Sequence, residues 1–319
     1  MAYLIKNAQA VFSPTVADAT DIRISDGKIT ELGRDLAPGA DETLIDARGC
    51  VVWPGLVNTH HHLAQSIMKG VPGGLNQNLN DWLGSVPYRY WPKVTPELMY
   101  HAARLGLYEL LRSGGTTCAD HHYLYHATTS PELEDAVWRA ADELGMRMVL
   151  CRGSATSVGS HHGMLEHGIA PETIEQIIER LDASRVRYHQ DGGDVMRKLV
   201  VAPTSLIHSS DPDGLREQAA YAREFKLGMH SHLLEVDFDE VASLIYFESL
   251  AISEAFFVFP RYSGLRANES RLLEIPTALP PLSDPSRNAG VFLLVYWGKS
   301  RRPGILYYGF ASSPGFGTK

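Results

Sequence analysis

The sequence predicts an α/β fold: a partial (β/α)8 barrel of about five strand–helix units, preceded by a small β module and followed by a tail of different character. Three observations support this prediction. Apolar strands alternate with amphipathic helices between residues 53 and 241, histidine pairs end the first and fifth expected strands, and the composition changes abruptly at residue 242. Such alternation is typical of a parallel sheet, and a closed barrel would need eight units.

Residues 1–52 predict the β module. Two stretches have the character of short strands, AYLIKNAQAVF and DIRISDGKITELG. In the second, Ile22 and Ile24 alternate with polar residues, and Asp26-Gly27 is typical of a primed hairpin turn. We therefore expect a hairpin centred on Gly27.

Residues 53–241 predict the five units. The expected strands are CVVWPGLVNTH, TTCADHH, RMVLCRG, KLVVAPTS and MHSHLLE. The expected helices are PELMYHAARLGLYELLRSGG, PELEDAVWRAADELG, PETIEQIIERLDASRVRY and DPDGLREQAAYAREFKLG. Helices of this length between buried strands imply right-handed crossovers and parallel pairing.

Residues 242–319 form a tail that breaks this rhythm. Up to Ala242 the chain carries 32 acidic and 21 basic residues, whereas the remainder carries 5 and 8. The tail also holds 13 of the 29 aromatic residues. Two of its stretches, VFLLVYW and GILYYGF, have β composition. The shift favours a segment of separate origin, and we hypothesise an out-of-frame or mis-joined extension of a longer coding sequence.

The composition disfavours several classes of partner. A net charge of −8 disfavours nucleic acid and anionic membranes. No apolar run approaches the roughly 18 residues of a membrane helix, and the first thirty residues lack the order of a signal peptide. Three scattered cysteines, Cys50, Cys118 and Cys151, fit a reduced compartment better than a secreted protein. We therefore expect a cytoplasmic protein.

Histidines at two strand ends indicate a metal site. His60 and His62 share one face of the first strand, roughly 7 Å apart, and His61 faces the other way. In a parallel barrel the fifth strand ends at the same edge, and it carries His230, His232 and Glu235. Three neutral imidazoles with one open position are typical of catalytic zinc. The alternatives are a solvent-facing triplet at 60–62 and satisfied core histidines in the second pair.

These residues resemble the amidohydrolase superfamily, and within it the hydrolytic deaminases of cytosine, guanine and 8-oxoguanine together with the hydroxyatrazine-type hydrolases. PGLVNTHHHLAQS (54–66) is similar to the signature of the first barrel strand, and HSHLLE (230–235) matches the motif HxHxxE. IRISDGKITELG and DARGCVVWPG resemble an N-terminal β-sandwich entering the barrel. NQNLNDWLGSVPYRYWP and CADHHYLYHA are most similar to the 8-oxoguanine deaminase group. The resemblance covers about residues 1–241.

The resemblance implies a role for individual residues. His60, His62 and His232 match the metal ligands, His230 matches the non-ligand histidine of the motif, and Glu235 matches the acid/base that moves a proton from water to the departing nitrogen. One divalent ion, Zn²⁺ or alternatively Fe²⁺, would lower the pKa of its water from 15.7 toward roughly 7. Water would then add to the carbon bearing the exocyclic amine of a purine-like ring, and ammonia would leave. The resemblance also implies a small heterocyclic substrate and a homodimer.

Four further residues are candidates for substrate binding. Gln65 follows the first histidines, and Trp82, expected in a loop, could stack on a planar ring. His122 and Ser205 end predicted strands, as does His121. The alternatives for Gln65 and Trp82 are a polar helix start and ordinary loop packing.

The sequence departs from the family in its last part. The family uses a histidine on the sixth strand and an aspartate on the eighth, but this sequence has no histidine after His232, and Asp284 lies in a turn-like SDPSRN. Three interpretations follow: a working metal-dependent deaminase, a truncated member without activity, or a non-catalytic metal-binding protein. Translating the other two reading frames beyond codon 242 tests the hypothesis of a mis-joined tail, since one of them should continue the barrel.

Overall fold

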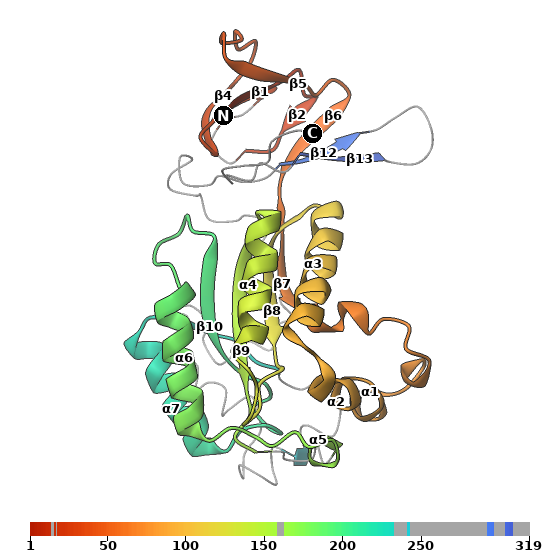
Figure 1. Cartoon of the computed structure of the whole chain (residues 1–319). Coiled ribbons are helices and arrows are strands. Elements are labelled where there is room, and N and C mark those ends of the chain that lie inside the picture. Colours follow the sequence, from red (N-terminus) through yellow and green to blue (C-terminus); the bar gives the residue numbers. More distant parts are fainter. Residues whose placement is uncertain are drawn as a thin grey trace.

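The computed structural model describes residues 1–13, 16, 18–157, 163–232 and 241–242, together with the backbone of two strands at 292–296 and 304–308. The described strands form three sheets (Figure 1). Two small sheets lie together at one end of the molecule, and a parallel sheet flanked by helices occupies the rest.

The two small sheets are built mainly from the N-terminal residues and have the orders β4-β3-β1-β5 and β13-β12-β6-β2. Their strands are β1 (Ala2–Lys6), β2 (Ala10–Val11), β3 (Asp21–Ser25), β4 (Lys28–Gly33), β5 (Glu42–Asp46), β6 (Cys50–Pro54), β12 (Phe292–Tyr296) and β13 (Gly304–Tyr308). Side chains of both sheets, among them Ile5, Ile22, Ile45 and Val52, share one core. Asp26 and Gly27 have φ angles of 50° and 76°, so the predicted primed hairpin is confirmed.

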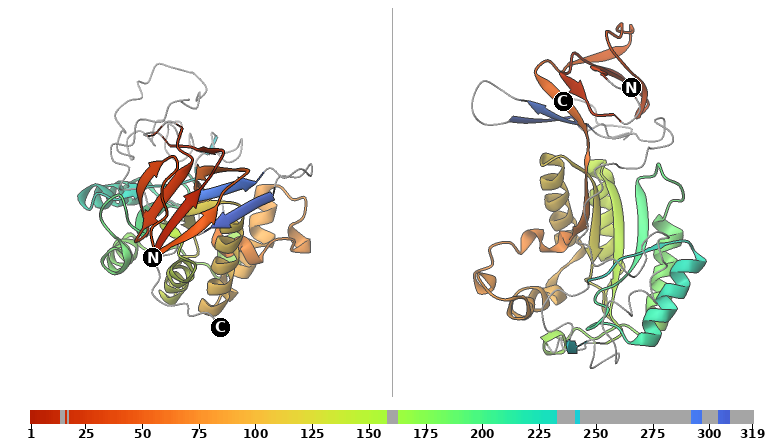
Figure 2. Two further views of the ribbon diagram at one scale, coloured as in Figure 1. Left: turned by 90° about the horizontal axis from the view of Figure 1, so that it is seen from above. Right: turned by 180° about the vertical axis from the view of Figure 1, so that it is seen from behind.

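Two tail segments take part in these small sheets. The strand β12 pairs antiparallel with β6 on one side and with β13 on the other. VFLLVYW and GILYYGF therefore each contain a strand, as their composition suggests. The first of these strands, β12, lies beside β6, which is about 240 residues earlier in the chain (Figure 2).

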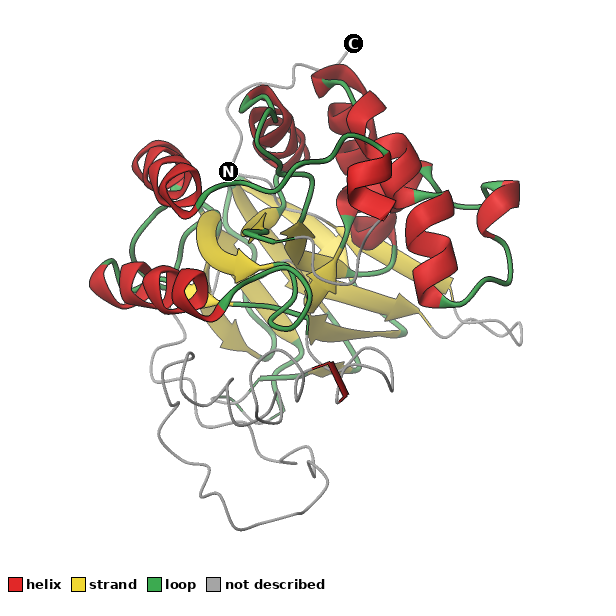
Figure 3. Ribbon diagram, turned by 90° about the horizontal axis from the view of Figure 1, so that it is seen from below, coloured by secondary structure: helices red, strands yellow, loops and turns green. Residues whose placement is uncertain are grey.

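The larger sheet contains five strands in the order β11-β10-β9-β8-β7, all parallel. The strands are β7 (Leu56–His61), β8 (Gly115–His122), β9 (Arg147–Ser154), β10 (Arg197–Pro203) and β11 (Gly228–Met229). The long helices are α3 (Pro96–Arg112), α4 (Glu132–Leu144), α6 (Ile174–Tyr188) and α7 (Pro212–Glu224). The helices line the outside of the curled sheet (Figure 3), so the predicted α/β fold with five parallel strands is confirmed.

Helix boundaries follow from capping residues. Thr95 and Asp211 accept hydrogen bonds from the backbone N–H groups three residues on, and each is followed by proline at the first helical position. Thr173 and Gln176 form a reciprocal capping box at the start of α6. These caps fix where α3, α6 and α7 begin, and therefore where the loop before each of these helices ends.

Two sequence predictions need correction. The stretch 229–235 is not a continuous strand as far as it is described: β11 ends at Met229, and His232 pairs with Ser205 through one isolated bridge. Trp82 lies on a short helix, α1 (Leu79–Ser85), capped by Asn78, and not in a loop. Five other short segments are η1 (Leu63–Ile67), η2 (Pro72–Gly74), α2 (Pro87–Tyr90), η3 (Trp91–Lys93) and α5 (Gly163–Glu166).

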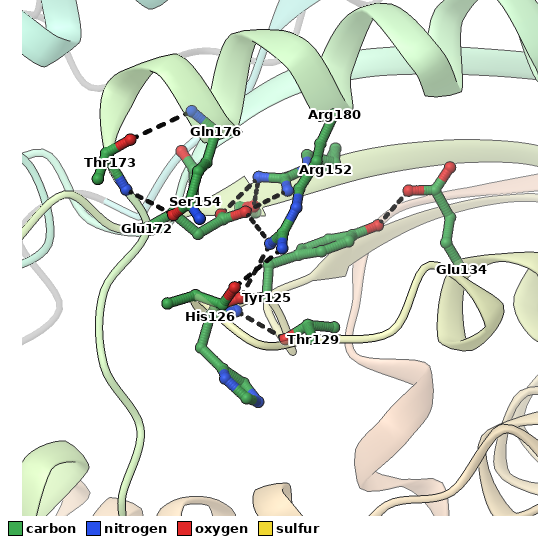
Figure 4. Close-up of polar contacts among 12 residues, drawn as sticks. Tyr125, His126, Thr129, Glu134, Arg152, Ser154, Glu172, Thr173, Gln176 and Arg180 are labelled. Carbon is green, nitrogen blue, oxygen red and sulfur yellow. Dashed lines mark hydrogen bonds and ion pairs between the residues drawn. The ribbon is translucent and has the colours of Figure 1, made fainter.

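A buried ion-pair cluster ties two of the carboxyl-edge loops together (Figure 4). Arg152 at the end of β9 donates to both carboxylate oxygens of Glu172, at 2.8 and 2.7 Å, and its guanidinium lies 3.9 Å from the centre of the Tyr125 ring. Arg180 on α6 donates to the same carboxylate at 2.7 Å and to two backbone carbonyls of the loop after β8. The loops after β8 and β9 are thereby held at fixed positions beside the sheet edge.

None of the helices in the described part of the chain is both long enough and apolar enough to cross a membrane.

Candidate metal centre

The expected histidines meet at the carboxyl edge of the parallel sheet. His60 and His61 end β7, and His62 is the residue before η1. His230 and His232 follow β11, at the other side of the sheet. The chain turns at the end of β7, so the rings of His60 and His62 lie 4.8 Å apart between centroids, nearer than the straight-strand spacing.

The three histidines expected as ligands converge on one point. One ring nitrogen each from His60, His62 and His232 lie within 4.8 Å of one another. The Nε2 atoms of His62 and His232 are 3.2 Å apart. Nitrogen atoms bound at about 2.0–2.1 Å to one tetrahedral zinc are separated by a similar distance. The spacing therefore fits a single ion held by these three imidazoles.

Backbone carbonyls set the orientation of two of these rings. The Nδ1 of His62 lies 2.8 Å from the carbonyl oxygen of His121, and that of His232 lies 2.5 Å from the carbonyl oxygen of Thr204. A carbonyl oxygen only accepts, so each Nδ1 carries the hydrogen and donates it. Each Nε2 is left with a free lone pair that faces the other ring, which is the arrangement found around metal-binding histidines.

Two of these imidazoles, those of His60 and His62, are kept neutral by partial removal from water. For His60, burial and then the neighbouring His232 and His230 rings lower the pKa to about 4. For His62, burial likewise lowers the pKa to about 4, although the bond to the His121 carbonyl acts in the opposite direction. Neutral rings at pH 7 have the lone pairs that a metal ion requires.

His61 faces away from this centre, as the alternation of the strand predicts. Its Nδ1 is buried and has no hydrogen-bond partner in the described part of the chain. Its ring lies towards α3, where a side chain on Gly106 would come within 3.5 Å of it. Burial lowers the pKa of His61 as well. We assign it no place among the converging nitrogens.

A cavity of about 170 Å³ opens beside the His62 and His232 rings. Three of the expected substrate-binding residues, Gln65, Trp82 and Ser205, line it. A second hollow of about 340 Å³ shares His62, Gln65 and Trp82 with it and reaches His60 and His61. These residues therefore lie between the converging imidazoles and open space.

The structure does not bring His122 into either hollow. Its side chain is 2% exposed, on the opposite face of β8 from His121, with Nδ1 3.5 Å from the Asp120 carboxylate. Asp120 in turn accepts a 2.7 Å hydrogen bond from the N–H of Leu63, the residue after His62. His122 thus lies in the packing behind the site, and Asp120 fixes the turn that follows the first histidines.

Glu235, the expected acid/base, lies outside the described residues.

Sequence reasoning missed the aromatic wall of the cavity. Tyr88, Trp91 and Tyr123 line it. The Tyr123 hydroxyl accepts a 2.9 Å hydrogen bond from Gln65 Nε2, and its ring packs edge-on against His62 at 5.1 Å. A signal was present in PYRYWP, where aromatic residues cluster, and in DHHY, where Tyr123 follows the end of a strand.

Comparison with known proteins identifies relatives of this chain. A model of the amidohydrolase family matches residues 51–244. An isoxanthopterin deaminase from an unknown prokaryotic organism is 39% identical over 77% of this chain and 53% of its own length. An 8-oxoguanine deaminase from Pseudomonas aeruginosa is 36% identical over 72% of this chain and 51% of its own length. The chain thus spans about half the length of these relatives.

A solved structure with the same fold contains zinc. The atrazine chlorohydrolase TrzN from Arthrobacter aurescens TC1, complexed with zinc, has a TM-score of 0.72 and 26% identity to this chain. The match covers 80% of this chain and 58% of that protein.

Proposed function

The chain belongs to the amidohydrolase family, and from this premise we propose that it is a metal-dependent hydrolytic deaminase of a purine-like heterocycle such as 8-oxoguanine, with His60, His62 and His232 as its metal ligands. The observation that carries the proposal is the 3.2 Å approach of the His62 and His232 Nε2 atoms, both freed by Nδ1 bonds to backbone carbonyls. The names of the relatives, isoxanthopterin deaminase and 8-oxoguanine deaminase, support the substrate class.

The proposed cofactor is one divalent ion, Zn²⁺ or alternatively Fe²⁺. When bound, such an ion supplies an acidified water as nucleophile at neutral pH. Zinc in the TrzN structure and the all-nitrogen donor set support Zn²⁺ first. Bonds to backbone carbonyls fix the tautomers of His62 and His232, and the lowered pKa values of His60 and His62 keep those two rings neutral at pH 7.

The residues of the cavity would bind and orient a planar ring. Trp82 offers a flat apolar face, and Gln65 has its Nε2 committed to Tyr123, which leaves its carbonyl oxygen to accept from a ring N–H. Ser205 adds a small hydroxyl at the floor beside His232. We propose Glu235 as the group that carries a proton from water to the departing nitrogen, so that one C–N bond is exchanged for one C–O bond and ammonia leaves.

The proposed organisation has three parts. Residues 1–52 correspond to an N-terminal β-sandwich portion, residues 53–241 to the first five units of a (β/α)8 barrel, and residues 242–319 to a non-family tail, by hypothesis frameshifted or mis-joined. The match of the family model to residues 51–244 supports the limits of the middle part. Three free and buried cysteines, Cys50, Cys118 and Cys151, support a cytoplasmic location.

A second candidate function is a metal-binding protein without turnover, or a truncated and inactive family member. The sequence observation that favours it is the lack of any histidine after His232. The family that the sequence resembles uses a further histidine and an aspartate from that part of its barrel.

Metal content and ammonia release, measured together, test these candidates. The purified chain is loaded with Zn²⁺, dialysed and offered 8-oxoguanine, guanine, cytosine and hydroxytriazines. We expect a single tightly bound ion, lost in His62→Asn and His232→Asn but retained in His101→Asn, an exposed histidine on α3. Ammonia release supports the deaminase, and bound metal without ammonia supports the non-catalytic candidate. A chain with neither metal nor a cooperative melt supports the truncated member.

A further inference from the structure

We propose that His121 and His230 are positioning residues for the metal centre, and that a chain of three imidazoles, His121–His230–His60, orients the His60 ring. The proposal rests on the proposed metal-binding function. It assigns a purpose to two histidines that neither hold the ion nor line the substrate cavity.

The contacts that carry this proposal run through ring nitrogens. His60 Nδ1 lies 3.3 Å from His230 Nε2, and His230 Nδ1 lies 2.9 Å from His121 Nδ1. The rings of His60 and His230 are nearly parallel, at 21°, with centroids 5.1 Å apart. His121 is completely buried on β8. The buried His121 ring can therefore hold the His230 ring in place, and through it the exposed His60 ring.

His60 is the ligand that needs this support. His62 and His232 are held by carbonyl oxygens. The His60 ring has its one hydrogen-bond contact among the described residues with His230. His121 acts on two of the three ligands, since its backbone carbonyl holds His62 while its ring reaches His60 through His230. One residue of β8 thereby orients two ligands, His60 near the end of β7 and His62 just after it.

The direction of the hydrogen bonds follows from ligation. If His60 Nε2 holds the ion, His60 Nδ1 carries the hydrogen and donates it to His230 Nε2. A neutral His230 then carries its hydrogen on Nδ1 and donates it to His121 Nδ1. His121 must therefore be protonated on Nε2, an atom that is buried and has no partner in the described part of the chain. The Thr59 carbonyl also contacts the His230 ring and is the competing acceptor.

Two substitutions of His121 separate a positioning role from a packing role. His121→Leu removes the polar atom that faces His230, whereas His121→Asn keeps a polar atom near the position of Nδ1. The backbone carbonyl that holds His62 is retained in both. We expect His121→Leu to weaken Zn²⁺ binding about 10–100-fold in competition with a chelator, the usual effect of losing such a partner. His121→Asn should recover most of the loss.

The control is Cys118→Ala, at a buried position of the same strand whose side chain packs in the hydrophobic core and not in the cluster. It should leave Zn²⁺ affinity unchanged. Equal affinity in His121→Leu and the native chain would overturn the positioning role. So would an equal loss in His121→Leu and His121→Asn, because packing would then explain both.

Imidazole ¹⁵N spectra of the zinc-loaded native chain test the same inference without any variant that has to fold. We expect the Nδ1–H form for His230 and the Nε2–H form for His121. An Nδ1–H form for His121 would mean that His121 donates to His230 Nδ1, so that His230 carries its hydrogen on Nε2 and cannot accept from His60; it would overturn the proposed chain. A native chain that binds no Zn²⁺ contradicts the proposed function itself, so the two failures are distinguishable.

Discussion

Gly153 lies where the end of β9 passes the end of β8 too closely for any side chain. A Cβ built on it would lie 2.5 Å from the His122 carbonyl oxygen and 2.7 Å from the Tyr123 Cα, both backbone atoms. Gly153→Ala must therefore push apart two strands at the edge that carries the histidines. We expect the free energy of unfolding, measured by urea denaturation, to fall by about 2–3 kcal/mol, the range for overpacking a core.

Gly84→Ala is the matched control, since a Cβ at that position of α1 meets nothing within 4 Å. It should be neutral or slightly stabilising, because alanine favours a helix. Equal destabilisation by both substitutions would contradict the steric explanation for Gly153.

The convergence of the first and fifth strand ends was predictable, but which side chains of the second strand, β8, face the site was not. The rule that carboxyl ends of parallel strands share one edge brings His60, His62 and His232 together from the sequence. The choice between His121 and His122 could not be made, because most of β8 is buried, on both faces. A strand buried on both sides has no hydrophobic alternation to show which residues face the barrel interior.

At the level of elements, the Arg152–Glu172 pair joins β9 to the loop before α6 without exposure to solvent. Glu172→Gln would leave the buried Arg152 charge without its carboxylate, while the partly exposed Arg180 can turn to water. We expect a loss of about 3–5 kcal/mol in the free energy of unfolding. Chemical denaturation measures this loss.

Two comparison variants make that prediction specific. Glu109→Gln removes an exposed ion pair with Lys69 and should cost less than about 1 kcal/mol. The double variant Arg152→Met/Glu172→Leu removes both buried charges and should recover much of the loss. A double variant as unstable as Glu172→Gln would show that the loss of free energy of unfolding comes mainly from the broken bonds to the loops and not from the unpaired charge.

Asp21 anchors the first small sheet through its ionised form. Its carboxylate is 1% exposed and accepts 2.9 Å bonds from the N–H groups of Asn7 and Leu36, with Lys6 at 3.5 Å. Burial raises its pKa, but the hydrogen bonds and the lysine outweigh this, so the pKa is lowered from 3.8. The unfolded chain therefore binds a proton more readily, and the stabilisation is lost as pH falls through the folded-state pKa.

We expect Asp21→Asn to lose about 2 kcal/mol at pH 7, the usual value of hydrogen bonds to a charged group, and this difference from the native chain should shrink below pH 4. Asp26→Asn, at an exposed turn where asparagine is favoured, should match the native chain at every pH. Urea denaturation between pH 7 and 2.5 measures both. A difference for Asp21→Asn that stays constant with pH would contradict an electrostatic origin.

Long elements were predictable and short ones were not. Helices α3, α4, α6 and α7 each span several turns, so their apolar periodicity and caps marked them to within a few residues. The helices α1 and α2, of 7 and 4 residues, are too short to show a period, and Trp82 was therefore expected in a loop. The cap at Asn78 was the one local signal for α1.

At the scale of the whole molecule, the parallel sheet has an edge strand, β7, with exposed apolar side chains. The middle strands β8, β9 and β10 are largely buried, as expected for parallel strands covered on both faces. On β7, by contrast, Leu56 is 49% and Val57 is 62% exposed. Among the described residues only β8 pairs with β7, and the other edge of β7 has no partner strand there. The chain spans about half the length of these relatives, and composition alone could not show which edge would be open.

An open apolar edge of this kind predicts self-association. Unpaired N–H and C=O groups beside exposed Val57 favour pairing with the same edge of another copy. We expect sedimentation velocity to show an average mass that rises with protein concentration in the micromolar range. Val57→Lys should shift the rise to concentrations about tenfold higher, because a charge at the edge opposes pairing at a cost of about 1.4 kcal/mol.

Val186→Lys, at a 72% exposed position on α6, adds the same charge away from the edge and should leave the association unchanged. If Val186→Lys shifts the association as far as Val57→Lys does, net charge and not the edge governs it; a native chain of constant monomer mass would mean that the edge of β7 attracts no second copy.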